Sequence, residues 1–155
     1  MNNNHITWFG RYEGYLRTIA RGVRDNNPRC IECAAKLFDL MLPEGAMVIP
    51  MPGHYGSARQ MLSVVRKLVK MRDDIAVYDI LKCEPHEANY SQKKYTIPAP
   101  IKMFFDEKKM CGECVNYGAN MFVIDNVICT GVTASAALEV LPDATVVALA
   151  MSSWR

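Results

Sequence analysis

A stretch of the chain between residues 122 and 135 combines residue types that can bind a phosphorylated sugar. An apolar run ends in Asp125 and Asn126, and the small-residue loop Thr130-Gly131-Val132-Thr133 follows and opens a predicted helix. The N–H groups of such a loop and the positive end of the helix dipole can hold a phosphate dianion. The nearby hydroxyl groups belong to Thr130, Thr133 and Ser135. We expect Asp125 and Asn126 to face the sugar that carries this phosphate.

Two common phosphate-binding motifs do not match this stretch. The lysine of a Gly-x-x-x-x-Gly-Lys-Ser/Thr loop is missing, and so is the Gly-x-Gly-x-x-Gly spacing of a dinucleotide-binding fold. The sequence therefore disfavours both of these nucleotide sites.

The cysteines form a second candidate site. Cys30 and Cys33, and Cys111 and Cys114, are two Cys-x-x-Cys pairs with the ligand count of a four-thiolate Zn²⁺ site. The pairs are far apart in the sequence, and the first lies in a predicted helix, where thiols at i and i+3 often simply pack. A structural zinc site, a redox pair at Cys111 and Cys114, and plain thiols all remain open.

Apolar patterns predict the elements that position these residues. Strands are expected over 6–9, 46–49, 75–81, 121–124 and 145–150, and helices over 12–23, 34–42, 57–72 and 133–140. The segment 25–28 should end the first helix and begin the second, and Ser57 should cap the third. Residues 82–120 show no sustained period and are expected to form a long mobile loop. The order of elements predicts an α/β fold with a mainly parallel, twisted sheet and helices on both faces.

Composition indicates one globular domain over 1–155, with 1–45 as an N-terminal strand and helices. Of the 155 residues, 50% are apolar and 22% charged, and 18 basic against 16 acidic residues leave a net charge of +2. This dispersed charge is not that of a dedicated nucleic-acid-binding protein. No apolar run reaches the roughly 18 to 20 residues of a membrane span, and the polar start lacks a signal peptide. We therefore expect a cytoplasmic protein with no membrane partner and with reduced cysteines.

The stretch Phe122 to Thr133 resembles the signature of type I phosphoribosyltransferases that binds phosphoribosyl pyrophosphate (PRPP). The signature has four apolar residues, two acidic ones and an apolar-rich stretch that ends in Thr-Gly-x-Thr. The layout of 46–150 is also similar, since the family has a pyrophosphate-binding loop after its first core strand and a mobile catalytic loop before the signature. The run Val48-Ile49-Pro50-Met51-Pro52 more weakly resembles ComF-like members. The resemblance implies the phosphoribosyltransferase fold, here with a small or reduced hood over the site.

The resemblance also implies roles for individual residues. Asp125 and Asn126 would bind the ribose hydroxyls, with Asp125 an indirect contact to Mg²⁺. The residues that would enclose the 5-phosphate are Thr130, Gly131, Val132 and Thr133, and Cys129 is also expected to bind PRPP. The residues that would meet pyrophosphate are Met51, Pro52, Gly53, His54 and Arg59. Lys93 or Lys94 on the long loop is the candidate to stabilise the leaving group, since the reaction passes through an oxocarbenium-like ribose.

The chain departs from the family pattern at two positions. Asn126 stands where the signature has a second acid, and Cys129 stands where the hypoxanthine-guanine branch has an acid/base aspartate, which disfavours a 6-oxopurine acceptor. We expect a Mg²⁺-dependent transfer of the phosphoribosyl group from PRPP to a small nitrogenous acceptor, in a homodimer. The alternatives are a non-catalytic module of the same fold that binds PRPP or a nucleotide, and a zinc-stapled interaction protein.

Overall fold

The computed structural model describes residues 5–87, 100–106 and 120–152. The strands are β1 (Ile6–Arg11), β2 (Met47–Pro50), β3 (Ala76–Val77), β4 (Leu81–Cys83), β5 (Met103–Phe105), β6 (Met121–Ile128) and β7 (Thr145–Met151). The helices are α1 (Gly14–Arg24), α2 (Pro28–Met41), α3 (Arg59–Met71) and α4 (Val132–Val140). None of the helices within the described residues has the length and apolar character that crossing a membrane requires.

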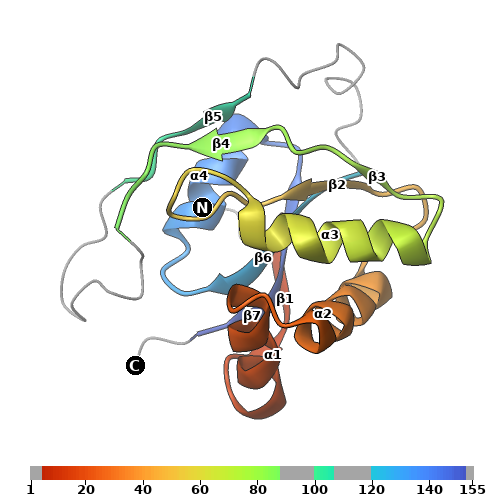
Figure 1. Cartoon of the computed structure of the whole chain (residues 1–155). Helices are drawn as coiled ribbons and strands as arrows, with labels where there is room; N and C mark the ends of the chain where they lie inside the picture. The colour runs from red at the N-terminus through yellow and green to blue at the C-terminus, as the bar shows by residue number, and fades with distance from the viewer. Residues whose placement is uncertain (1–4, 88–99, 107–119, 153–155) are drawn as a thin grey trace.

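Five strands form one parallel sheet in the order β1-β7-β6-β2-β3, and β4 pairs with β5 in a separate antiparallel sheet. The predicted α/β class with a mainly parallel sheet is confirmed. Helices α1, α2 and α3 lie on one face, and α4 lies on the other face together with β4 and β5 (Figure 1). The predicted helices on both faces are therefore also confirmed.

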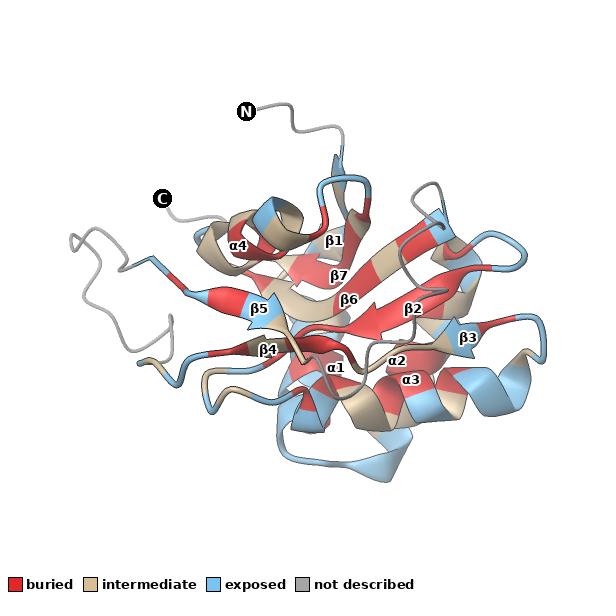
Figure 2. Cartoon of the chain, turned by 90° about the horizontal axis from the view of Figure 1, so that it is seen from above, coloured by how far each residue is buried: buried red, intermediate tan, exposed pale blue. Residues whose placement is uncertain are grey.

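The sheet is buried on both faces because neighbouring residues of its strands belong to two separate cores. Val48 packs under α1, α2 and α3, whereas the next residue, Ile49, packs under α4 and the small sheet, and both are 0% exposed. Val123 and Ile124 divide in the same way. Buried residues accordingly fill β2 and β7, whereas β1 at the sheet edge is largely exposed (Figure 2). This pattern explains why the central strands appear in the sequence as continuous apolar runs.

The connection between α1 and α2 follows the sequence prediction. The side chain of Asn27 accepts hydrogen bonds from the backbone N–H of Arg29 (3.0 Å) and of Cys30 (3.3 Å), and Pro28 is the first residue of α2. The cap expected at Ser57 is wrong: α3 begins after Ala58, without a side-chain cap from the described residues. Ser57 instead belongs to the preceding turn, where its carbonyl accepts the N–H of Gly53 at 2.8 Å.

The single strand predicted over 75–81 is also wrong. Only β3 joins the main sheet, with a last hydrogen bond from the N–H of Tyr78 to the carbonyl of Val48 (2.9 Å), and the chain then leaves to form β4. The apolar run misled the prediction because Ile75 is buried in one core and Leu81 in the other. The expected loop 82–120 thus contains the end of β4 and all of β5.

Helices α1 and α2 pack closely where Gly22 faces Cys30. A Cβ atom at Gly22 would lie 2.1 Å from Sγ and 2.4 Å from Cβ of Cys30, so a larger residue must push the helices apart. We expect Gly22→Ala to lower the free energy of unfolding by about 1–3 kcal/mol, as overpacking does. Urea denaturation measures this change.

The matched control is Gly53→Ala, whose added Cβ would meet only ordinary van der Waals contact, 3.6 Å from the carbonyl oxygen of Ser57. Its unfolding midpoint should stay near that of the unaltered protein. A Gly22→Ala variant as stable as this control would contradict the close packing of the two helices.

Candidate functional site

A cavity of about 330 Å³ lies at the carboxyl ends of β2 and β6. From β2 the chain continues through α3 on one face of the sheet, and from β6 it continues through α4 on the other face. The two connections therefore diverge and leave a crevice, which is where open α/β sheets bind ligands. The volume is in the range of small-molecule sites.

This cavity is lined by residues from both divergent loops, from both faces of the sheet and from the position after β7. The wall consists of Tyr12, Ala20, Arg21, Arg24, Pro52, Gly53, His54, Gln60, His86, Asp125, Asn126, Val127, Ile128, Cys129, Thr130, Gly131, Thr133, Ala134 and Ser152.

The amino end of α4 forms one side of the cavity. Gly131 precedes the helix with φ of +80°, a left-handed conformation that glycine adopts without strain. The N–H of Val132 points back to the hydroxyl of Thr130 at 3.4 Å, and no side chain among the described residues caps the helix at Gly131. Because the first turn of a helix leaves backbone N–H groups without intrahelical acceptors, this side of the cavity suits an anion.

The loop after β2 forms the facing side and is held by the strand β4. The N–H of Cys83 donates to the carbonyl of Gly56 at 3.2 Å, and the N–H of His86 donates to the carbonyl of His54 at 2.9 Å. The thiol of Cys83 lies 3.3 Å from the carbonyl oxygen of Gly53. Gly56 itself has φ of +96°, and a Cβ there would lie 2.7 Å from the carbonyl of Cys83. The small sheet thus holds the loop after β2, in which Gly56 adopts a left-handed conformation.

Asp125 is the only carboxylate among the described residues that line the cavity. Burial raises its pKa to about 6, although the N–H of Asn126, which donates to Oδ1 at 2.7 Å, favours the charged form. Burial, followed by the nearby charge of Asp125, also raises the pKa of the Cys129 thiol. The thiol is therefore a protonated group at neutral pH, without the character of a catalytic nucleophile.

Asn126 makes a contact that the sequence did not predict. Its Nδ2 donates to the carbonyl of Ala20 on α1 at 2.9 Å, whereas its buried Oδ1 has no hydrogen-bond partner among the described residues. The expectation that the two polar residues follow the strand is wrong, because β6 continues through them to Ile128. Asn126 thereby joins β6 to α1.

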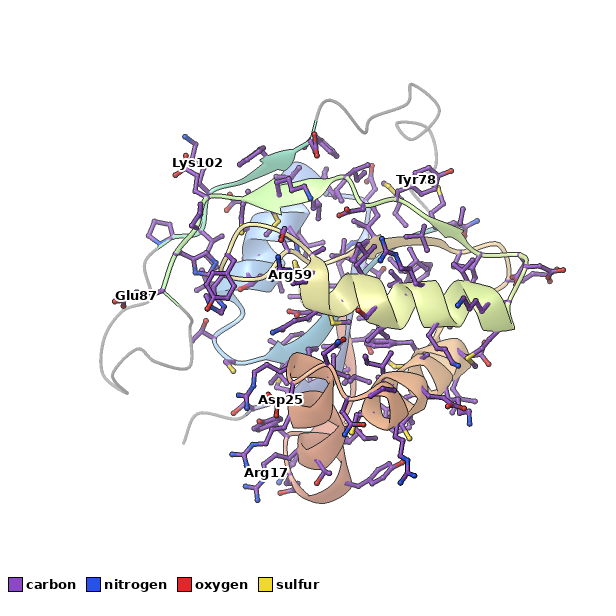
Figure 3. All side chains as sticks on the ribbon, viewed as in Figure 1. Arg17, Asp25, Arg59, Tyr78, Glu87 and Lys102 are labelled. Atoms are coloured by element: carbon purple, nitrogen blue, oxygen red, sulfur yellow. The ribbon has the colours of Figure 1, made fainter. Side chains whose placement is uncertain are left out.

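Most of the predicted site residues lie together in the cavity wall. Those that do are Pro52, Gly53, His54, Asp125, Asn126, Cys129, Thr130, Gly131 and Thr133. Four predicted residues are not among the described residues of the wall: Met51, Arg59, Val132 and Ser135. Met51 is 2% exposed and packs in the core, as Val132 does in part, and Arg59 is exposed at the start of α3 (Figure 3).

Sequence reasoning missed six residues of the wall with polar or charged side chains: Tyr12, Arg21, Arg24, Gln60, His86 and Ser152. Gln60 directly follows the predicted Arg59, whereas the other five come from elements that are distant in sequence from both loops, and each of the six has the type of an ordinary surface residue. No local pattern distinguishes them, since only the folded sheet brings them to the cavity.

The predicted zinc ligands fall partly outside the described residues. Cys30 and Cys33 lie on α2, where the Cys30 sulfur is 4.0 Å from the carbonyl of Thr18, while Cys111 and Cys114 lie outside the part of the chain that the structure describes. Lys93 and Lys94 also lie outside it. Within 5–87, 100–106 and 120–152 no three His, Cys, Asp or Glu side chains form a group that could hold a metal ion.

Comparison with known proteins does not assign the chain to a family. No model of a known protein family matches the sequence. No curated protein matches it either.

The contact between Asn126 and Ala20 predicts the effect of placing an aspartate at position 126, where the resembled signature has its second acid. In Asn126→Asp a carboxylate oxygen would replace the amide nitrogen 2.9 Å from a carbonyl oxygen. We expect a loss of about 1–3 kcal/mol in the free energy of unfolding, the usual penalty for an unsatisfied buried polar group. Urea denaturation at pH 7 measures it, with Asn126→Ala as the control that removes the amide without adding charge. An aspartate variant at least as stable as the native protein would contradict the contact.

The raised pKa of Asp125 predicts a pH dependence of stability. The folded-state value of about 6 lies above the ordinary 3.8, so the native state binds more protons than the unfolded state between these values. The stability that the protonated group contributes is complete below pH 3.8 and is lost as the pH rises through about 6. The stability of Asp125→Asn relative to the native protein should therefore increase from pH 4 to 7.

Denaturant unfolding at several pH values tests this, with Asp143→Asn at an exposed position as the control. If the two variants showed the same pH profile relative to the native protein, the burial of the Asp125 carboxylate would be refuted.

Proposed function

We propose that the protein is a phosphoribosyltransferase that uses PRPP and Mg²⁺, transfers the phosphoribosyl group to a nitrogenous acceptor and releases pyrophosphate. The observation that carries the proposal is the cavity between β2 and β6. Among the described residues it combines the amino end of α4, the Asp125 carboxylate and the glycine-containing loop after β2, which leads to α3 on the opposite face of the sheet. These are the groups needed for a phosphate, a sugar and a second phosphate group.

The 5-phosphate binds at the amino end of α4. The backbone N–H groups of the first turn, the hydroxyls of Thr130 and Thr133, and the helix dipole all favour a dianion. The left-handed Gly131 allows the backbone to turn into the helix without a side chain between the phosphate and the N–H groups.

Asp125 binds the ribose. Asp125 lies in β6, the strand that leads to the loop Thr130 to Thr133. Its carboxylate is on the cavity wall and accepts hydrogen bonds from the sugar hydroxyls. Ligand hydroxyls also replace part of the hydration that burial removes, so PRPP binding favours the charged form of Asp125.

The residues present fit a Mg²⁺ ion that is held mainly by the substrate. Mg²⁺ commonly binds one or two carboxylates together with substrate phosphates, and Asp125 supplies one carboxylate, which would hold the ion indirectly. When bound, the ion neutralises charge on the pyrophosphate.

The loop after β2 receives the pyrophosphate. Gly53 and His54 lie on the cavity wall opposite α4, and Cys83 at the end of β4 and His86 just after it hold their backbone in place. A preorganised loop stabilises the departing group without reorganising during the reaction. Lys93 and Lys94 remain candidates for the same role, from the part of the chain outside the described residues.

Asn126 favours a second candidate function, a non-catalytic module that binds PRPP or a nucleotide. Its amide is held by Ala20, with one of its two N–H donors engaged, and the position lacks the negative charge that the resembled signature has there. The two functions share the binding site and differ in whether pyrophosphate is released.

Calorimetric titration with PRPP and Mg²⁺ tests the proposal. We expect micromolar binding, about −8 kcal/mol, that Asp125→Ala weakens strongly because the ribose hydroxyls lose their acceptor. Asp143→Ala, at an exposed position, is the matched control and should bind normally. Pyrophosphate release with a panel of nitrogenous acceptors then separates the enzyme from the binding module. No binding at millimolar PRPP would refute both.

A further inference from the structure

One wall of the cavity has no role in the binding of PRPP described above. It consists of the last turn of α1, with Arg21 and Arg24, and of two residues at the ends of the neighbouring strands, Tyr12 after β1 and Ser152 after β7. These residues carry two guanidinium groups, a phenol and a hydroxyl.

The order of the strands places this wall away from the expected leaving group. Along the sheet the order is β2, β6, β7 and β1, so the pyrophosphate loop lies on one side of the signature strand, and Ser152 and Tyr12 lie on the other. A nucleophile that displaces pyrophosphate must approach the ribose from the side opposite the departing group. The wall of Tyr12, Arg21, Arg24 and Ser152 is on that side.

Three hydrogen bonds hold this wall in position. Nδ2 of Asn126 donates to the carbonyl of Ala20 at 2.9 Å, one residue before Arg21. The N–H of Tyr12 donates to the carbonyl of Met151 at 2.9 Å, and the N–H of Ser152 donates to the carbonyl of Ile128 at 2.8 Å. The contact of Asn126 thereby has a function: it fixes the turn of α1 that carries Arg21 against the signature strand.

The charge of this wall is positive. Arg24 is 43% exposed, and its Nε pairs with Asp25 at 3.3 Å, at the end of α1 (Figure 3). For Arg21 no ion pair is recorded within the described residues, and Asp125 is the only acid that they contribute to the cavity. A guanidinium group next to a half-enclosed cavity favours a carboxylate, which it binds through two parallel hydrogen bonds.

We propose that this wall is the acceptor subsite and that the acceptor is a planar nitrogen compound that carries a carboxylate. Arg21, with Arg24, binds the carboxylate, and Tyr12 contacts the ring. In the reaction the acceptor nitrogen bonds to C1 of the ribose, the bond from C1 to the pyrophosphate oxygen breaks, and its electron pair leaves with pyrophosphate. An acceptor N–H releases its proton to water, whereas a pyridine nitrogen has no proton to release and becomes a pyridinium. The inference rests on the proposed function and adds the substrate class.

The competing explanation is that the two arginines only stabilise the carboxyl end of α1, whose last turn attracts cations. Under that explanation Arg21→Gln would lower stability slightly and would leave the choice of acceptor unchanged. The two explanations therefore differ in acceptor selectivity, which stability alone does not affect.

The experiment compares acidic ligands with neutral analogues on protein saturated with Mg²⁺ and PRPP. The matched pairs are orotate and uracil, nicotinate and nicotinamide, and anthranilate and aniline, with binding and pyrophosphate release both recorded. We expect at least one acid to bind about tenfold or more tightly than its neutral partner, as a bidentate charged pair allows. Arg21→Gln should remove this preference, and Arg21→Lys should restore only part of it.

Arg17→Gln is the control, because Arg17 is exposed on the same helix and is not among the residues that line the cavity (Figure 3). It should keep the preference for the acid. If PRPP binds but acids and neutral analogues bind equally, or if Arg21→Gln keeps the preference, the acceptor inference is overturned and the proposed function stands. If PRPP itself does not bind, both are overturned.

Discussion

The parallel pairing of β2 with β6 is the constraint on which the rest of the molecule depends. Their register aligns Pro50 with Ile124, so both strands deliver their following residues to the same end of the sheet. The helix α3 leads toward one edge of the sheet and α4 leads toward the other. Because crossovers between parallel strands are right-handed, the two helices must lie on opposite faces of the sheet. The cavity is the space between these connections, so the backbone topology alone creates it.

Two further contacts convert this space into a shaped site. The small sheet of β4 and β5 holds the loop after β2, while Nδ2 of Asn126 holds the end of α1. Both contacts join segments that are far apart in the chain. Burial in this space raises the pKa of Asp125, because it disfavours the charged form of the carboxyl.

The regular elements were predictable because their apolar patterns follow from burial. The strands β2, β6 and β7 have continuous apolar runs since both of their faces are covered, and α1 to α3 show one apolar stripe each. The same reasoning failed at 75–81, where two buried segments in different layers give one uninterrupted run. The residue type of Ser57 likewise led to a wrong prediction of the cap of α3, because the carbonyl of Ser57 completes a turn with Gly53.

The site was predictable only where it is contiguous in sequence. Residues around Asp125 and Gly131 form a local pattern, and the structure brings most of them to one cavity together with Pro52 to His54. Arg21 and Ser152 had no such pattern, since the strand order alone places the ends of α1 and β7 beside β6. The role of Asn126 was unpredictable for the same reason, because its partner is the carbonyl of Ala20 on α1.

The central claim, that the cavity holds a sugar phosphate at the amino end of α4, is tested most directly by NMR titration with ribose 5-phosphate. We expect the backbone amide signals of Thr130 to Thr133 to shift most, together with that of Asn126, whose N–H donates to the Asp125 carboxylate that we propose to bind the ribose. Inorganic phosphate should shift the loop amides but not that of Asn126. Unchanged loop amides at millimolar ribose 5-phosphate would contradict the claim.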